Sequence, residues 1–281
     1  MAKGTGLIGN FKGKVGNMVG YNLKDSNNKQ TQGIRVYQPV VRNPKSYAQA
    51  QQRCIMKPIN DFYRALKPVI SRGQEGKAYG NASRLAWLKN VMKDFNGPWL
   101  VKGSTEQWPI ACMVTSGSLP GLVLESVDVD STQILANAAT TTENPTIAQL
   151  STALKSSYSF LEDGDQITIV SINGNATFEN VMVESFVIDT TDTTVAAKFT
   201  MQDGVIIYIE PSTLGHKQVA GCVIVSREGS NGQHLRSTST IQFDAATAAN
   251  DVYKSAAKAA AIVSYMAAGD NTDWPQEALE G

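Results

Sequence analysis

The stretch QVAGCVIVSRE, residues 218–228, carries a run of apolar residues between polar ends and is typical of a β-strand. Seven further runs of this kind follow Gly103, and turn signals such as EDGDQ and EGSNGQ separate them. In chain order they are PIACMVTSG, GLVLESVDV, QITIVSI, TFENVMVESFVID, VAAKFTM, VIIYIEP and HLRSTSTIQFD. This succession predicts a β-rich domain, sandwich-like or barrel-like, over residues 104–268.

Two helical patterns belong to this β-rich region. One helix is predicted at about residues 146–157, after the start signal Asn144-Pro145. An alanine-rich helix at about residues 245–268 closes the domain, and a polar tail, residues 269–281, follows. Together with the helices that precede the strands, the pattern predicts the α+β class.

Residues 42–103 are predicted to form a basic helical region. A first helix begins near Ser46 and continues to about Ser71, and Pro58 and Pro68 should kink or divide it. Its apolar side chains share one face of a helical wheel, namely Ile55, Ile59, Phe62, Leu66, Val69 and Ile70.

A second helix is predicted at about residues 79–95. It stops at Asn96-Gly97-Pro98, a glycine and a proline in the order that ends helices. Its predicted apolar side consists of Leu85, Leu88, Val91 and Met92.

Residues 1–41 are predicted to form a glycine-rich basic arm. Residues 15–24 and 30–41 flank the polar turn DSNNK, which indicates a β-hairpin. Glycines stand at positions 4, 6, 9, 13, 16 and 20 and leave few side chains to pack, so we expect a partner to order the arm.

Charge is distributed unevenly along the chain, although the net charge is zero. Residues 1–103 hold 18 lysines and arginines against 4 acids, a balance of +14, and residues 104–281 hold 7 against 21, a balance of −14. Such asymmetry predicts that the two regions face different partners.

The glycine-rich start imitates two phosphate-binding motifs and satisfies neither of them. Gly4 to Gly9 matches GxGxxG, but only three residues precede it, where a dinucleotide fold needs a strand. Gly9 to Lys14 has three residues between its glycines instead of the four of a Walker A loop, and Val15 replaces the magnesium-binding hydroxyl residue. No cofactor is predicted.

Metal and catalytic motifs are also missing from the sequence. His216 and His234 have no ligand at metal spacing, and no G-x-S-x-G nucleophile elbow occurs. The acidic turn at residues 162–165 lacks the ligand ladder of an EF-hand. Three distant cysteines in apolar contexts indicate free, buried thiols. We expect no metal, no catalytic residue and no enzymatic activity.

A basic stripe on the first helix is the most informative candidate site. It has three interpretations, which are a solvated face, a contact with the acidic face of a neighbouring subunit, and a contact with nucleic acid. With the basic residues of the arm and of the helix start, the candidate subunit or DNA contacts are Lys12, Lys14, Arg42, Lys45, Arg53, Lys57, Arg64 and Lys67.

Two segments resemble the N-terminal signature of a protein family of Bacteroidetes and their bacteriophages. They are GxxKGKVGNxVG, residues 9–20, and RNPKSYAQAQQR, residues 42–53. CVIVSREGSNGQHLRSTSTI, residues 222–241, is similar to a strand pair near that family's end. The family has no established activity, so no catalytic residue carries over. The resemblance implies a virion structural protein in the neck or tail of a crAss-like phage.

The leading hypothesis is a non-enzymatic ring protein of a phage neck or tail, made in the host cytoplasm because no secretory signal is visible. Its expected partners are copies of itself, neighbouring virion proteins and, in a DNA channel, packaged DNA. No segment is apolar enough for a membrane contact. Two alternatives remain, a nucleic-acid-binding protein that uses the basic helix and a β-sandwich binding or adhesin module.

Overall fold

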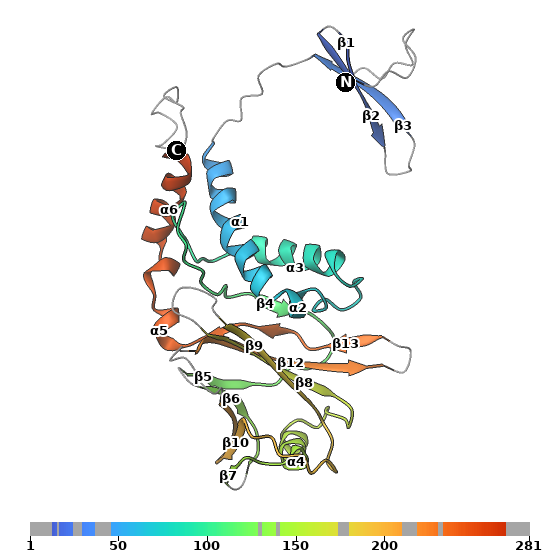
Figure 1. Cartoon of the computed structure of the whole chain (residues 1–281), viewed down its shortest axis with the longest axis vertical. Helices are drawn as coiled ribbons and strands as arrows, with labels where there is room; N and C mark the ends of the chain where they lie inside the picture. Colours follow the sequence, from blue (N-terminus) through green and yellow to red (C-terminus); the bar gives the residue numbers. More distant parts are fainter. Residues whose placement is uncertain are drawn as a thin grey trace. The chain divides into compact units, whose positions relative to one another are not determined.

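A computed structural model shows how the predicted elements assemble. It describes residues 13–15, 17–24, 30–36, 46–128, 131–138, 141–173, 180–209, 218–229 and 233–267. The chain divides into two compact units, Met1–Lys45 and Ser46–Gly281, which are described separately below. Helices and antiparallel sheets are both present, so the predicted α+β class with a β-rich part is confirmed (Figure 1).

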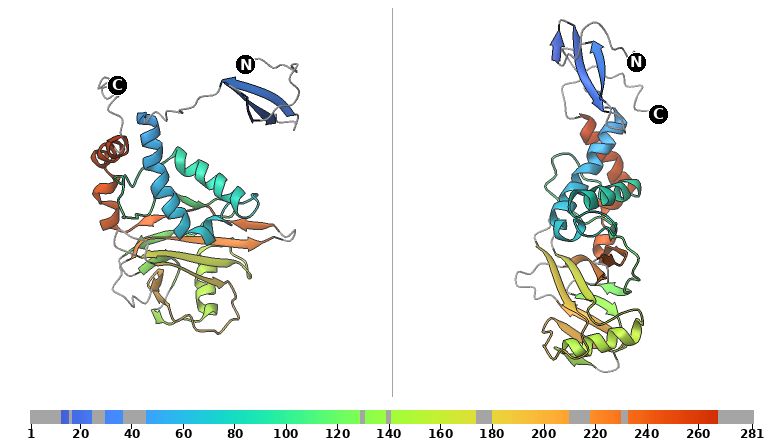
Figure 2. Two further views of the ribbon diagram at one scale, coloured as in Figure 1. Left: turned by 45° about the horizontal axis from the view of Figure 1, so that its top comes forward. Right: turned by 90° about the vertical axis from the view of Figure 1, so that its right-hand side faces the viewer.

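The first unit contains a three-stranded antiparallel sheet in the order β1-β2-β3 (Figure 2). Its strands are β1 (Gly13–Val15), β2 (Met18–Lys24) and β3 (Gln30–Val36). The predicted hairpin is confirmed, with Lys24 opposite Gln30 at one end and Met18 opposite Val36 at the other. Its turn, residues 25–29, lies outside the described residues.

The second unit begins with a helical layer of three helices. They are α1 (Tyr47–Ala65), α2 (Lys67–Ile70) and α3 (Asn81–Lys93). The predicted apolar face of the first helix is confirmed, because Ile59, Phe62 and Ile70 are fully buried. The helical pattern continues across Pro58 and divides at Leu66, directly before the turn that contains Pro68.

The predicted apolar side of α3 is wrong at one position. Leu85 is 53% exposed, whereas Trp87 and Val91 are buried together with Ser83. Residues four apart share a helix face, so the Ser83–Trp87–Val91 stripe leaves Leu85 on another side. The Ser83 hydroxyl donates to the Ile70 carbonyl at 2.7 Å, which helps to hold that stripe against α2.

Two sheets form the β-rich part of the second unit, as a sandwich. The central sheet has the order β13-β12-β8-β9 and contains β8 (Gln166–Asn173), β9 (Asn180–Val187), β12 (Gln218–Glu228) and β13 (His234–Arg236). The second sheet has the order β5-β6-β11-β10-β7 and contains β5 (Leu124–Val127), β6 (Ser131–Leu135), β7 (Thr142–Glu143), β10 (Phe199–Gln202) and β11 (Val205–Ile209). Short pairings add β4 (Met113–Thr115), β14 (Ser239–Thr240) and β15 (Gln242–Phe243).

The central sheet is covered on both faces, which explains its uninterrupted apolar runs. Side chains alternate along a strand, so Ile169 and Val223 pack into the core shared with the second sheet. Val170 and Cys222, their neighbours in sequence, pack into the core shared with the helical layer. The helices α1 to α3 and the β-rich part of the second unit therefore share a core through this sheet.

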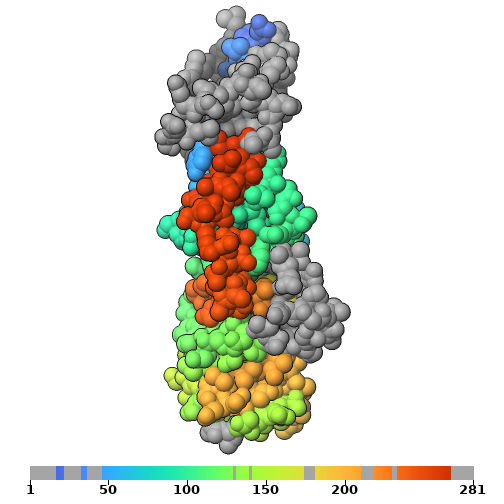
Figure 3. All heavy atoms as spheres, turned by 90° about the vertical axis from the view of Figure 1, so that its left-hand side faces the viewer, coloured from blue at the N-terminus to red at the C-terminus, as the bar shows by residue number. Residues whose placement is uncertain are grey.

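The helix predicted at about residues 146–157 is confirmed. The C-terminal helix is not continuous. The first is α4 (Ile147–Ser157), and the alanine-rich segment forms α5 (Ala245–Ala248), the 3-10 turn η1 (Asp251–Tyr253) and α6 (Ser255–Ala267). The single helix predicted at 245–268 is wrong because the Asn250 side chain accepts from the Val252 N–H at 3.1 Å and caps a new turn. Figure 3 shows these elements, in orange and red, stacked along the second unit.

Candidate functional site

The structure brings only part of the predicted basic stripe together. Lys57 Nζ lies 3.2 Å from one Asp61 carboxylate oxygen, and an Arg64 guanidinium nitrogen lies 3.5 Å from the other. Arg53, also on α1, is exposed. Lys67 is exposed as well but belongs to α2. Asp61 thus neutralises the middle of the stripe, which weakens it as a continuous track for a phosphate backbone.

The remaining predicted contacts lie in or near the first unit. Lys14 belongs to β1, and only its backbone is described. Lys12, Arg42 and Lys45 lie outside the described residues.

One face of the arm sheet carries exposed apolar side chains. Met18 stands opposite Val36, and Gly20 stands opposite Ile34, so Met18, Ile34 and Val36 share a face. Ile34 is 51% exposed and Val36 is 76% exposed. On the other face Tyr21 lies over Gly33, where a Cβ would come within 2.7 Å of the tyrosine ring. The arm therefore has one face closed by an aromatic ring and one open apolar face.

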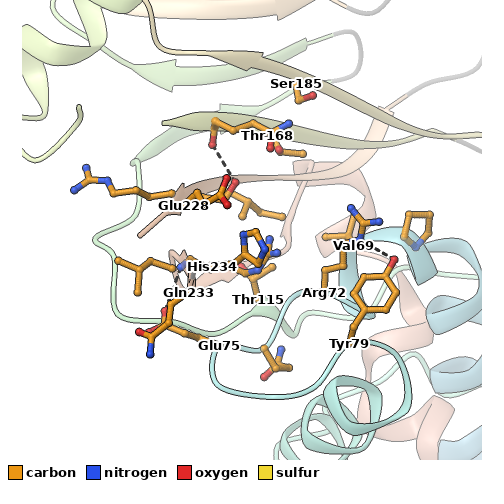
Figure 4. Close-up of a pocket in the computed structure, with 18 of the residues that line it drawn as sticks. Val69, Arg72, Glu75, Tyr79, Thr115, Thr168, Ser185, Glu228, Gln233 and His234 are labelled. Carbon is orange, nitrogen blue, oxygen red and sulfur yellow. Dashed lines mark hydrogen bonds between the residues drawn. The ribbon is translucent and has the colours of Figure 1, made fainter. Parts of the chain in front are cut away.

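A groove of about 1140 Å³ opens where the helical layer meets the central sheet (Figure 4). The helices cover Val181 on β9 but leave Val183 and Val187, on the same face, 46% and 49% exposed. The segment after α2 and the strand β13 line the groove on the side away from these valines. The sheet side of the groove thus carries exposed valines among polar side chains, and the other side carries a set of polar and charged groups.

Two arginines from distant parts of the chain meet at this groove. Arg72 Nε donates to the Tyr79 hydroxyl at 2.7 Å, and the guanidinium stacks 4.8 Å from the centre of the same ring. This hydrogen bond lowers the pKa of Tyr79. Burial, and then the nearby charge of Arg72, lower the pKa of Arg236 on β13. Among the described residues no carboxylate or carbonyl accepts a hydrogen bond from the Arg236 guanidinium.

The Glu75 carboxylate lines the same groove as these arginines, and most of its hydrogen-bonding capacity is used by other groups. Its oxygens accept from the Ser118 N–H and hydroxyl, both at 2.8 Å, and from the Arg236 N–H at 3.1 Å. Burial raises the pKa of Glu75, but these hydrogen bonds outweigh it and lower the pKa overall. Gly117 permits the arrangement, because a Cβ there would lie 2.5 Å from a Glu75 oxygen.

The acidic turn at residues 162–165 holds an arginine. Arg227 donates to the two oxygens of Asp165 at 2.6 and 2.8 Å, to the Phe160 carbonyl at 2.7 Å and to Glu162 at 2.6 Å. These hydrogen bonds, led by that to Asp165, raise the pKa of Arg227. Asp163 pairs with Lys155 at 2.9 Å. The turn is a clamp for Arg227 at the edge of the groove.

The three cysteines are free and buried, as predicted. Burial raises the pKa of Cys54 to about 11 and that of Cys222 to about 12, and it raises the pKa of Cys112 as well. Thiolates, the reactive form of cysteine, are therefore disfavoured at these positions.

The described residues bear on the predicted absence of a metal site and of a membrane contact. His234 is exposed at the groove, and His216 lies outside the described parts. In the described parts of the chain no three His, Cys, Asp or Glu side chains gather as ligands for a metal ion. Among the same residues no helix has the length and apolar character required to cross a membrane.

Sequence reasoning missed the groove, since its charged groups come from remote segments. Arg72 and Glu75 follow α2, whereas Arg236 ends β13 and lies near the start of the run HLRSTSTIQFD, which was predicted only as a strand. No spacing of residues along the sequence predicts that these side chains lie in one groove. Comparison with protein-family models, with curated proteins and with solved structures gives no match.

Proposed function

We propose that this protein is a structural subunit that assembles with copies of itself into a closed ring. The observation that carries the proposal is the open apolar face of the arm, formed by Met18, Ile34 and Val36. A three-stranded sheet of this size cannot cover such a face by itself. Exposed apolar patches of this kind mark surfaces that another protein covers.

Charge supports a second copy as the partner of the arm. Residues 1–45 hold 8 lysines and arginines and a single acid, whereas residues 46–281 hold 17 basic and 24 acidic residues. The arm of one subunit thus complements the rest of another in sign, which favours head-to-tail contacts that close into a ring.

The resemblance of residues 9–20 and 42–53 to a phage-associated family supplies the biological setting of the proposal. In that setting the ring belongs to the neck or tail of a tailed-phage virion, with neighbouring virion proteins as further partners.

The adhesin alternative receives less support from the tryptophans. Glycan platforms use exposed aromatic faces, but Trp87 and Trp99 are buried, and Trp108 is half-buried with its indole N–H donating to Glu106 at 3.1 Å. The nucleic-acid alternative is weakened by Asp61, which pairs with both Lys57 and Arg64.

The oligomeric state of the purified full chain tests the proposal. We expect a multimer by size-exclusion chromatography with light scattering, and rings by electron microscopy. The double variant Ile34→Ser/Val36→Ser should raise the concentration needed for assembly about tenfold or more, because each exposed side chain loses most of its apolar burial in the contact.

A matched control is Leu85→Ser, which removes an equally exposed apolar side chain from α3. It should leave assembly unchanged. A full chain that stays monomeric at every concentration, also when mixed with other virion proteins, would refute the proposal.

A further inference from the structure

The groove between the helical layer and the central sheet is not used by the proposed arm contact. It holds two guanidinium groups of like charge, Arg72 and Arg236, within one hollow. The Glu75 carboxylate beside them already accepts three hydrogen bonds from Ser118 and Arg236 backbone and hydroxyl groups. An anion placed between the guanidinium groups would offset their repulsion and accept their free N–H groups.

The neighbouring cations differ in their availability. Arg227 is occupied by Asp165, Glu162 and Phe160, so it does not compete for an incoming anion. Lys77 is exposed at the groove and adds positive charge. The carboxylates of Glu75 and of Glu228, at the end of β12, partly offset the positive charge of the groove.

The opposite side of the groove offers apolar surface to a ligand. Val183 and Val187 are half exposed on the strand face that the helices leave open. Ser185 and Thr168 lie on the same side, facing the Arg72 and Tyr79 side of the groove (Figure 4). A ligand that fits both walls carries carboxylates next to large apolar side chains and is long enough to follow a strand.

We infer that the groove binds an extended acidic segment of a second copy, residues 269–281, GDNTDWPQEALEG. The inference rests on the proposed function, since it requires copies to meet. The segment has no lysine or arginine and carries four acids and two large apolar residues, namely Asp270, Asp273, Glu277, Glu280, Trp274 and Leu279. Its composition thus complements both walls of the groove.

A second copy is assigned because the segment of the same chain would have to run back along the whole helical layer to reach the groove. Figure 1 shows α6 ending beside the start of α1, at the end of the helical layer away from the sheet. The groove lies at the other end of this layer, where the segment after α2 approaches β12 and β13.

Fluorescence anisotropy with a labelled synthetic peptide of residues 269–281 tests the inference. The titrated protein is the full chain with Asp270→Asn, Asp273→Asn, Glu277→Gln and Glu280→Gln, so that its own segment does not compete. We expect saturable binding that weakens about tenfold or more when Arg72→Gln and Arg236→Gln are added, because charge-assisted hydrogen bonds are lost.

Three controls define the result. Lys89→Gln removes an exposed lysine of α3 outside the groove and should leave the affinity unchanged. A peptide with Asn and Gln at the four acidic positions should not bind. Arg72→Gln alone, at an exposed position, should give a smaller loss and keeps the test valid if the double variant unfolds.

The outcomes separate this inference from the proposed function. Assembly of the unmodified chain without peptide binding overturns the inference and leaves the ring proposal intact. A monomeric chain that binds the peptide overturns the second copy as its source. A short DNA duplex that displaces the peptide and needs the same two arginines shows a nucleic-acid site and overturns the inference.

Discussion

Arg227 and Asp165 form the most completely satisfied ion pair among the described residues. Asp165 is 1% exposed, and Arg227 bonds both of its oxygens while a further N–H reaches the Phe160 carbonyl. Removing one member of a buried pair leaves the other charge without compensation, which costs more than the pair contributes when intact.

The substitution Arg227→Gln is therefore expected to lower the free energy of unfolding by about 3 kcal/mol. Urea denaturation followed by circular dichroism measures it. The matched control is Lys155→Gln, because its partner Asp163 is 55% exposed and such pairs contribute less than about 1 kcal/mol. Equal losses of stability in the two variants would contradict a larger contribution of the Arg227–Asp165 pair.

At the residue scale, sequence patterns predicted burial well and contacts between distant residues poorly. The stripe of Ile59, Phe62 and Ile70 followed from helical periodicity. Leu85 was assigned to the core because apolar character alone was counted, whereas the buried stripe consists of Trp87, Val91 and the hydrogen-bonded Ser83. Glu75 and Arg236 meet through the tertiary fold, and periodicity carries no information on that.

Helix α4 shows how a local sequence signal fixes the start of an element. The Thr146 hydroxyl accepts from the Gln149 N–H at 3.3 Å, and the Gln149 side chain accepts from the Thr146 N–H at 2.9 Å. This reciprocal pair is a capping box, and it satisfies two donors that the first helical turn leaves free.

Thr146→Ala should lower the free energy of unfolding by about 1 kcal/mol through loss of this cap. Thr152→Ala is a suitable control, because Thr152 is exposed in the middle of the same helix, where alanine is the better helix former. Thermal and urea unfolding of both variants would measure the difference. A control as unstable as the cap variant would argue against the capping role.

At the element scale, the sequence was most informative where an element is long and strongly patterned. Strands β8 and β12 appeared as apolar runs because both their faces are buried. Strands β6 and β7 were missed because they are short and rich in polar residues. The C-terminal helix was predicted too long because alanine content hid the interruption at Asn250.

Opposite charge on the two units is a property of the whole molecule. The salt concentration sets the distance over which this charge acts between copies. At about 0.15 M salt, screening limits the interaction between exposed charges to a range of about 8 Å. Arg53 on α1 is exposed and is not paired with Asp61, so its charge is available to a neighbouring subunit.

Arg53→Glu is expected to raise the concentration for ring assembly several-fold at low salt, because it places a negative charge where the basic stripe is predicted to contact the acidic face of a neighbouring subunit. The difference from the unmodified chain should shrink as salt approaches about 1 M, where the screening length falls to about 3 Å. Light scattering over a salt series measures it. The proposed contact is wrong if Lys89→Glu, on α3, has the same effect.

The doubly covered central sheet also has a consequence for the order in which the chain is made. Helices α1 to α3 leave the ribosome before the strands of the central sheet, yet Ile59, Phe62 and Ile70 share their core with Ala220, Cys222 and Ile224 of β12. The apolar face of the helical layer thus stays incompletely covered until synthesis has passed residue 228. Native pairing of β8 with β12 likewise waits for that strand, so the nascent chain carries an uncovered apolar surface during this interval.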